Sequence, residues 1–145
     1  MNWKQEAIDK LRCYAARKHA LVSLPRQIEE TKLRRESVRG ARIDGKAAVG
    51  GGSNREDMLL GSLVHQEELE RRLRMTEAFV SGVESALEVL DQEDRLILDR
   101  FYIHPQRGCA DRLCDELSLE RASVYRRKDQ ALRRFTMALY GWEEA

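Results

Sequence analysis

The 145-residue sequence has few of the residues that interrupt helices or cross-link a fold: two prolines and three cysteines. Charged residues make up 35% of the chain and hydrophobic residues 42%, a balance that favours helices over sheets. An odd number of cysteines with no signal peptide before them indicates a reducing cytoplasm and no disulfide framework. No hydrophobic run is long enough to span a membrane. We therefore expect an all-α cytoplasmic protein without a membrane contact.

Motifs that would indicate an enzyme are also missing. The sequence has no Walker loop, no nucleophile with an adjacent base and no paired-carboxylate site. His104, Cys109 and Cys114 come nearest to a metal site, but their spacing matches no common zinc pattern and a fourth ligand is missing. We interpret these three side chains as packing residues. The sequence therefore predicts a protein that is not an enzyme and has no cofactor or metal.

The net charge of the chain is only +1 at pH 7. Strong nonspecific binders of nucleic acid are usually more basic, so any DNA contact must come from a local cluster of charge. Such a cluster lies between Ser118 and Phe135, where six basic residues and two acidic ones give a net charge of +4. This segment is the candidate for DNA contact.

Two helices and a loop are expected in the first 54 residues. Apolar residues at helical spacing predict an amphipathic helix from about Trp3 to Val22. Pro25 suits the first turn of a helix better than its interior, so we expect a second helix from Pro25 to about Val38. Five glycines without apolar periodicity predict a flexible loop over residues 40–54. Four arginines lie at the end of the second helix and the start of the loop: Arg34, Arg35, Arg39 and Arg42. They form either a phosphate contact or a solvated helix end.

A regular, mostly apolar stripe follows this loop. Its members alternate four and three residues apart, the spacing of a coiled coil or helical hairpin; they are Leu69, Leu73, Thr76, Val80, Val83, Leu87 and Leu90. Two partners are equally suited to cover this seam. One is the chain's own first helix, with Leu11, Tyr14 and Leu21 meeting the seam; the other is the same seam in a second copy, which would make a homodimer. Residues 1–90 are thus predicted to form an N-terminal antiparallel helical hairpin or coiled-coil region.

Residues 91–145 are predicted to form a second domain of three helices. Asp91 is placed to cap a helix that runs through Ile103, with Asp94 as a capping-box-like partner. Two further helices follow, joined by the three-residue turn at residues 118–120. Their facing apolar residues predict a shared core, with Leu96 and Phe101 of the preceding helix packed against it; these residues are Leu113, Cys114, Leu117, Leu119, Val124, Ala131, Leu132 and Phe135.

The last helix carries its polar residues on the side away from that core. Arginine and glutamine can form paired hydrogen bonds with purine edges in the major groove, and further arginines can neutralise phosphates. On this basis Arg126 lies at the centre of the exposed face, and Arg112, Arg127 and Arg134 are expected at phosphates. The candidate DNA-binding residues are Arg112, Arg121, Ala122, Ser123, Tyr125, Arg126, Arg127, Gln130 and Arg133.

The runs LDQEDRLILDRFY and LCDELSLERASVYRRKDQALRRF, between Leu90 and Phe135, resemble region 4 of sigma-70-type sigma factors. They resemble small prophage regulators of the RinA and ArpU type more closely, and a less specific similarity extends over nearly the whole chain. The resemblance implies a helix-turn-helix unit that binds promoter DNA, activates late phage genes and docks as a sigma-like element beside RNA polymerase. Ser118 stands where region 4 usually has glycine, and Ala122 stands where promoter-reading sigma factors have an acidic residue.

The sequence therefore predicts a sequence-specific, DNA-binding transcriptional regulator of prophage late genes, with double-stranded DNA and RNA polymerase as partners. Two alternatives remain open. A phage DNA-packaging protein of the small-terminase kind would also combine a helix-turn-helix with oligomerising helices. A helical adaptor that binds only protein would use its basic residues for solubility.

Overall fold

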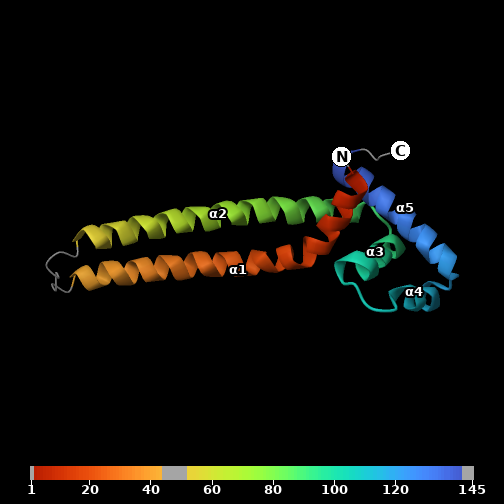
Figure 1. Ribbon diagram of the computed structural model, residues 1–145, viewed down its shortest axis with the longest axis horizontal. Helices are drawn as coiled ribbons and strands as arrows, with labels where there is room; N and C mark the ends of the chain where they lie inside the picture. The colour runs from red at the N-terminus through yellow and green to blue at the C-terminus, as the bar shows by residue number, and fades with distance from the viewer. Residues whose placement is uncertain (1, 44–51, 142–145) are drawn as a thin grey trace. The chain divides into compact units, whose positions relative to one another are not determined.

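The computed structural model describes residues 2–43 and 52–141. All regular structure in these two ranges is helical, which confirms the prediction of an all-α protein (Figure 1). The elements in chain order are α1 (Trp3–Ile43), α2 (Gly52–Glu88), α3 (Gln92–Leu98), the π-helical turn η1 (Asp99–Ile103), α4 (Cys109–Leu117) and α5 (Arg121–Tyr140). In these ranges no helix is both long enough and apolar enough to cross a bilayer.

The prediction of a helix boundary at Pro25 is wrong, because α1 runs through this residue without a break. A proline in a helix interior costs about 3 kcal/mol. Here Pro25 is exposed, while its neighbours Leu24 and Ile28 are buried. Burying such side chains stabilises by about 1.5–3 kcal/mol each, which offsets the cost of the proline.

The loop predicted over residues 40–54 is shorter than expected. Residues 40–43 continue α1, and residues 52–54 already belong to α2. Glycine is only about 1 kcal/mol less favourable than alanine in a helix interior, so one glycine does not end a helix of this length. The remaining part of the expected loop, residues 44–51, lies outside the described residues.

The described residues divide into two compact units. The core unit comprises residues 2–18 and 78–141, and the hairpin unit comprises residues 19–43 and 52–77. The start of α1 and the end of α2 therefore belong with the C-terminal helices. The domain boundary predicted at residue 90 falls inside the core unit.

A single apolar cluster explains why the core unit includes the start of α1 together with the C-terminal helices. Ala7 and Leu11 of α1, Val83 of α2 and Leu132 and Phe135 of α5 are all buried in it. Because α1 and α2 help to cover α5, residues 91–141 alone would leave part of this cluster exposed. Complete burial of these side chains thus requires segments that are more than 100 residues apart in the sequence.

A second cluster joins the three short C-terminal elements. Ile97 of α3, Leu113 of α4 and Val124 of α5 are fully buried against one another. Leu96 and Phe101, the residues expected to cover this core, are partly buried at its edge. The helix predicted to run through Ile103 ends as α3 at Leu98 and continues as the π-helical turn η1, whose last bond runs from the His104 N–H to the Asp99 carbonyl at 2.7 Å.

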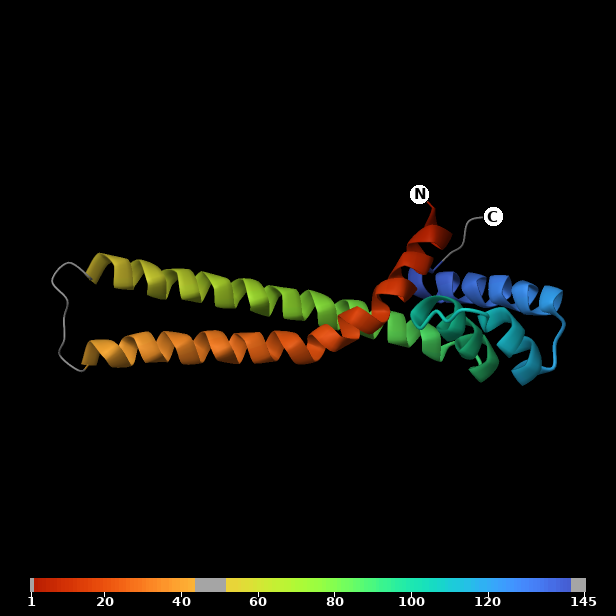
Figure 2. The same cartoon turned by 60° about the horizontal axis from the view of Figure 1, so that its bottom comes forward.

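In the hairpin unit α1 and α2 run antiparallel (Figure 2). Leu24 and Ile28 of α1 are buried against Leu69 of α2, with Leu73 at the edge of the cluster. Leu24 thus makes the contact that was expected of Leu21, which is only partly buried. The predicted seam is buried or partly buried at all seven positions from Leu69 to Leu90. Leu24 and Ile28 of α1 thus cover the seam at Leu69, and Ala7 and Leu11 of α1 lie in one cluster with Val83 and Leu90.

We expect Leu11→Ala to lower the free energy of unfolding by about 2–5 kcal/mol, because it leaves a cavity in the cluster that contains Leu132 and Phe135 of α5. Amide hydrogen exchange read by NMR should show faster exchange in α5, although the mutation lies in α1. Val22→Ala is the matched control, since Val22 is 66% exposed, and it should change stability by less than about 0.5 kcal/mol. Unchanged exchange in α5 on Leu11→Ala would contradict the shared core.

Candidate nucleic-acid interface

The turn between α4 and α5 is held by the backbone of α4. Ser118 has φ 54° and ψ 44°, which is the left-handed conformation that usually favours glycine. The Leu119 N–H donates a hydrogen bond to the Cys114 carbonyl at 3.1 Å. The Leu119 side chain is partly buried against the cluster of Ile97, Leu113 and Val124. Ser118 therefore adopts the left-handed conformation at a cost of roughly 1–2 kcal/mol.

The buried face of α5 is the one predicted from the sequence. Val124, Ala131, Leu132 and Phe135 are fully buried. Thr136 is buried beside them, and its hydroxyl donates to the Leu132 carbonyl at 2.7 Å. Because an α-helix has 3.6 residues per turn, burial of this stripe fixes which residues lie on the opposite side.

The opposite face of α5 presents Ala122, Arg126, Gln130 and Arg133, all of which are exposed. Within the described residues, no hydrogen bond, ion pair or ring contact involves Arg126 or Arg133. Seven residues of helix separate these two arginines by about 10 Å along the axis. Two unpaired guanidinium groups with an amide between them form a surface that can donate to base edges or phosphates.

One flank of this face is tied to an aromatic group. The Tyr125 ring lies 5.7 Å from the Phe101 ring, and the Lys128 ammonium lies 5.0 Å from the centre of the Tyr125 ring. The Arg121 guanidinium lies 6.0 Å from the same ring, and Ser123 on the other flank is partly buried. A cation over a ring face is attracted by the ring's quadrupole, so Tyr125 and Lys128 hold one another in place.

The other flank contains an ion-pair network around a buried carboxylate, which the sequence pattern did not predict. The Asp94 carboxylate is completely buried and accepts from Arg127 at 3.2 Å and from Arg134 at 2.6 Å. Glu93 also pairs with Arg127 at 3.1 Å. Burial lowers the pKa of Arg127, but hydrogen bonds to Asp94 and Glu93 outweigh this effect and raise the pKa above its ordinary value. Two of the three arginines expected at phosphates, Arg127 and Arg134, therefore have ion-pair partners within the molecule.

Asp91 and Asp94 have different roles, although the sequence placed both at a helix cap. Asp91 is the N-cap of α3, and its side chain accepts from the Asp94 N–H at 2.8 Å, as expected. The Asp94 side chain points away from the cap to the two arginines of α5. A carboxylate three residues after an N-cap suggests a capping box, and only the packing of α5 against α3 gives it partners 33 and 40 residues away.

Helix α4 contributes little positive charge to this surface. Its one arginine, Arg112, is exposed and donates to the Gln106 side chain at 2.8 Å. Asp111, Asp115 and Glu116 are exposed on the same helix, and Glu116 pairs with Arg100 at 3.3 Å. The basic surface is therefore concentrated on α5.

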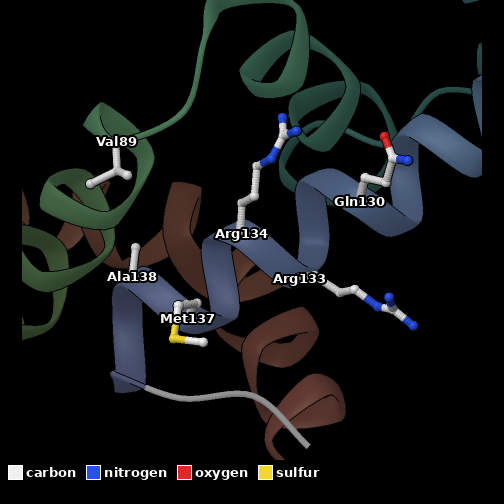
Figure 3. A pocket seen from close by; sticks show the side chains of 6 residues that line it. All are labelled: Val89, Gln130, Arg133, Arg134, Met137 and Ala138. Carbon is white, nitrogen blue, oxygen red and sulfur yellow. The ribbon is translucent and has the colours of Figure 1, made fainter. Parts of the chain in front are cut away.

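A groove of about 570 Å³ lies beside the exposed face of α5, with Val89 on its far side. In Figure 3 Val89 faces Ala138, Arg134 points toward the interior of the unit and Arg133 extends in another direction, away from it. The contrast agrees with the contacts: Arg134 reaches Asp94, whereas Arg133 has no such partner among the described residues. Met137 adds a partly exposed apolar surface to this groove.

The residues considered for a metal site do not gather around a common centre. His104 contacts Asp99 through Nδ1 at 2.8 Å, and Cys109 and Cys114 are partly buried, free thiols. Within residues 2–43 and 52–141 no group of three or more His, Cys, Asp or Glu residues is arranged to hold a metal ion.

No family model, curated protein or solved structure matches the chain.

The Asp94 network predicts an asymmetric response to mutation. Asp94→Asn leaves two arginines that can turn to water, so we expect a loss of about 1–3 kcal/mol in unfolding free energy. Arg127→Met combined with Arg134→Met leaves a buried carboxylate without a counter-charge, so we expect a larger loss of about 3–5 kcal/mol. Urea denaturation of the two variants measures the difference. Equal losses would show that Asp94 is accessible to water.

Proposed function

We propose that the protein is a sequence-specific DNA-binding transcriptional regulator, in which α4, the turn and α5 act as a helix-turn-helix and α5 enters the major groove. The observation that carries this proposal is the exposed stripe of Arg126, Gln130 and Arg133 on α5, opposite a fully buried stripe. Arginines without an internal partner remain free to bind an acceptor outside the molecule. A face of this chemistry suits base edges that present acceptors.

The residues of this surface have separate roles in the proposal. Arg126 and Arg133 donate in pairs to guanine, and Gln130 pairs with adenine. Arg121, Ser123 and Tyr125 near the start of α5 contact the backbone and fix its orientation in the groove. Ala122 gives close approach without a polar contact.

The two remaining candidates act at the edge of the interface. Arg112 contacts a phosphate from α4. Arg127 stays in its ion pairs with Glu93 and Asp94 and orients α5, in place of the phosphate contact predicted from the sequence.

The resemblance of residues 90–135 to sigma region 4 and to prophage regulators extends the proposal from DNA binding to a biological role. By this resemblance, the protein activates late phage genes in the cytoplasm, as a sigma-like element beside RNA polymerase. A homodimer would place two α5 helices on paired half-sites. Such a dimer would form through the N-terminal helices, as predicted from the sequence.

One observation favours the alternative of a helical adaptor. Leu60 and Val64, one turn apart on α2, are exposed, and exposed apolar residues are common where proteins bind one another. The two functions differ in salt dependence. Binding of a protein to duplex DNA releases counterions from the phosphates, so its affinity falls steeply as the salt concentration rises. A protein-only adaptor shows no DNA affinity at any salt concentration.

Selection of bound sites from random duplex DNA with the full chain tests the proposal directly. We expect a preferred site and an affinity that falls steeply between about 50 and 200 mM salt. The symmetry of the selected site also reports whether one or two copies bind. Failure to enrich any sequence at low salt would overturn the proposal.

We expect Arg126→Ala to reduce discrimination at one base position by about 1–3 kcal/mol, because one bidentate contact is lost. Affinities for single-base variants of the selected site measure this effect. Arg26→Ala removes the same charge from an exposed position of the hairpin unit and should leave the preference unchanged. An unaltered base preference in the Arg126 variant would remove this residue from the readout.

A further inference from the structure

The seam of the hairpin unit changes character along its length. On both helices the facing positions recur four and three residues apart. One part of the seam is apolar, where Leu24, Ile28 and Leu69 are buried together. Continuing the same spacing toward the connected ends of the two helices reaches partly buried side chains that are polar or charged: Thr31, Arg35, Ser62 and Gln66. A guanidinium group thus lies at a position where this packing ordinarily places an apolar side chain.

Two atoms in this polar part of the seam lack partners. Arg35 Nη1 and Gln66 Oε1 are buried and have no hydrogen-bond partner among the described residues. The neighbouring polar groups are turned along their own helices: the Thr31 hydroxyl donates to the Gln27 carbonyl, and the Gln66 amide nitrogen donates to Glu70, both at 2.8 Å. Buried polar groups in folded proteins are almost always paired. The Arg35 guanidinium therefore has a buried donor that no described residue satisfies.

A groove of about 290 Å³ opens beside Arg35 between α1 and α2. Its lining includes Arg34, Arg35, Val38, Met58, Ser62 and His65, and among the described residues it contains no carboxylate. Within the described residues neither Arg34 nor Arg35 forms an ion pair. The groove thus combines hydroxyl and imidazole groups, an apolar wall and two positive charges that have no ion pair within residues 2–43 and 52–141. Its volume lies just below the usual range of small-molecule sites, which is about 300–1,000 Å³.

We propose that this groove binds a small organic anion, a phosphomonoester or a carboxylate that carries a short apolar group. The planar guanidinium of Arg35 pairs with the anionic oxygens, and Arg34 adds a second charge at the mouth of the groove. Ser62 and His65 provide further hydrogen bonds, while Val38 and Met58 contact the apolar group. The site uses residues of the hairpin unit alone, so it is independent of the proposed DNA-binding function.

Titration of the full chain with phenyl phosphate, followed by calorimetry and NMR, tests this site. Inorganic phosphate carries the charge without the apolar group, and phenol carries the ring without the charge. We expect phenyl phosphate to bind at least fivefold more tightly than inorganic phosphate, and phenol not to bind. Chemical-shift changes should concentrate at Arg35, Ser62 and His65. No binding of phenyl phosphate would overturn the proposal and leave water as the partner of Arg35 Nη1 and Gln66 Oε1.

Mutations separate this site from general attraction to a basic surface. Arg35→Gln should weaken phenyl phosphate binding at least tenfold, and Arg34→Gln severalfold. Arg26→Gln removes an exposed charge from α1 outside the groove and should leave the affinity unchanged. Circular dichroism checks that each variant is folded; if Arg35→Gln is not, the Arg34 variant decides the outcome. Equal weakening by Arg26→Gln and by the groove variants would overturn the proposal.

Discussion

Burial of one stripe of α5 is the constraint on which the core unit depends. Leu132 and Phe135 lie in a cluster with the start of α1 and the end of α2, and Val124 lies in a second cluster with α3 and α4. Each large side chain contributes about 1.5–3 kcal/mol when it is fully buried. Because helix geometry links the two faces, the same packing turns Arg126 and Arg133 toward solvent. Stability and the orientation of the candidate DNA-binding face thus have one cause.

The Asp94 carboxylate distinguishes two pairs of arginines on α5, whose fifth arginine, Arg121, pairs with Asp111 at 3.8 Å. Arg127 and Arg134 are held by this buried group, whereas Arg126 and Arg133 have no hydrogen bond or ion pair among the described residues. An unpaired buried carboxylate is costly, so the network is stable only when α3 and α5 are in register. The proposed readout of DNA therefore relies on Arg126 and Arg133. In this proposal the contacts of Arg127 and Arg134 with Asp94 fix the orientation of α5.

The hairpin unit shows that one repeat can support two kinds of contact. Spacing of four and three residues brings Leu24 and Leu69 together in an apolar contact. The same spacing places Arg35 at a helix–helix position, where its buried Nη1 has no hydrogen-bond partner in the described part of the chain. A hairpin closed only by apolar contacts would have no need for this charge. The charged side chain of Arg35 in an otherwise apolar seam supports the proposal that the neighbouring groove binds an anion.

The sequence by itself determined the helical class, the buried stripe of α5, the turn at Ser118 and the exposed position of Arg126, because these follow from spacing within one helix or turn. The spacing also predicted the seam from Leu69 to Leu90, but it left open whether the first helix or a second copy packs against that seam. Only the tertiary structure decided that α1 passes through Pro25, that Leu11 covers α5, and that Asp94 binds arginines of another helix. These contacts join residues distant in the sequence, so their energies outweigh local preferences only after the helices have packed.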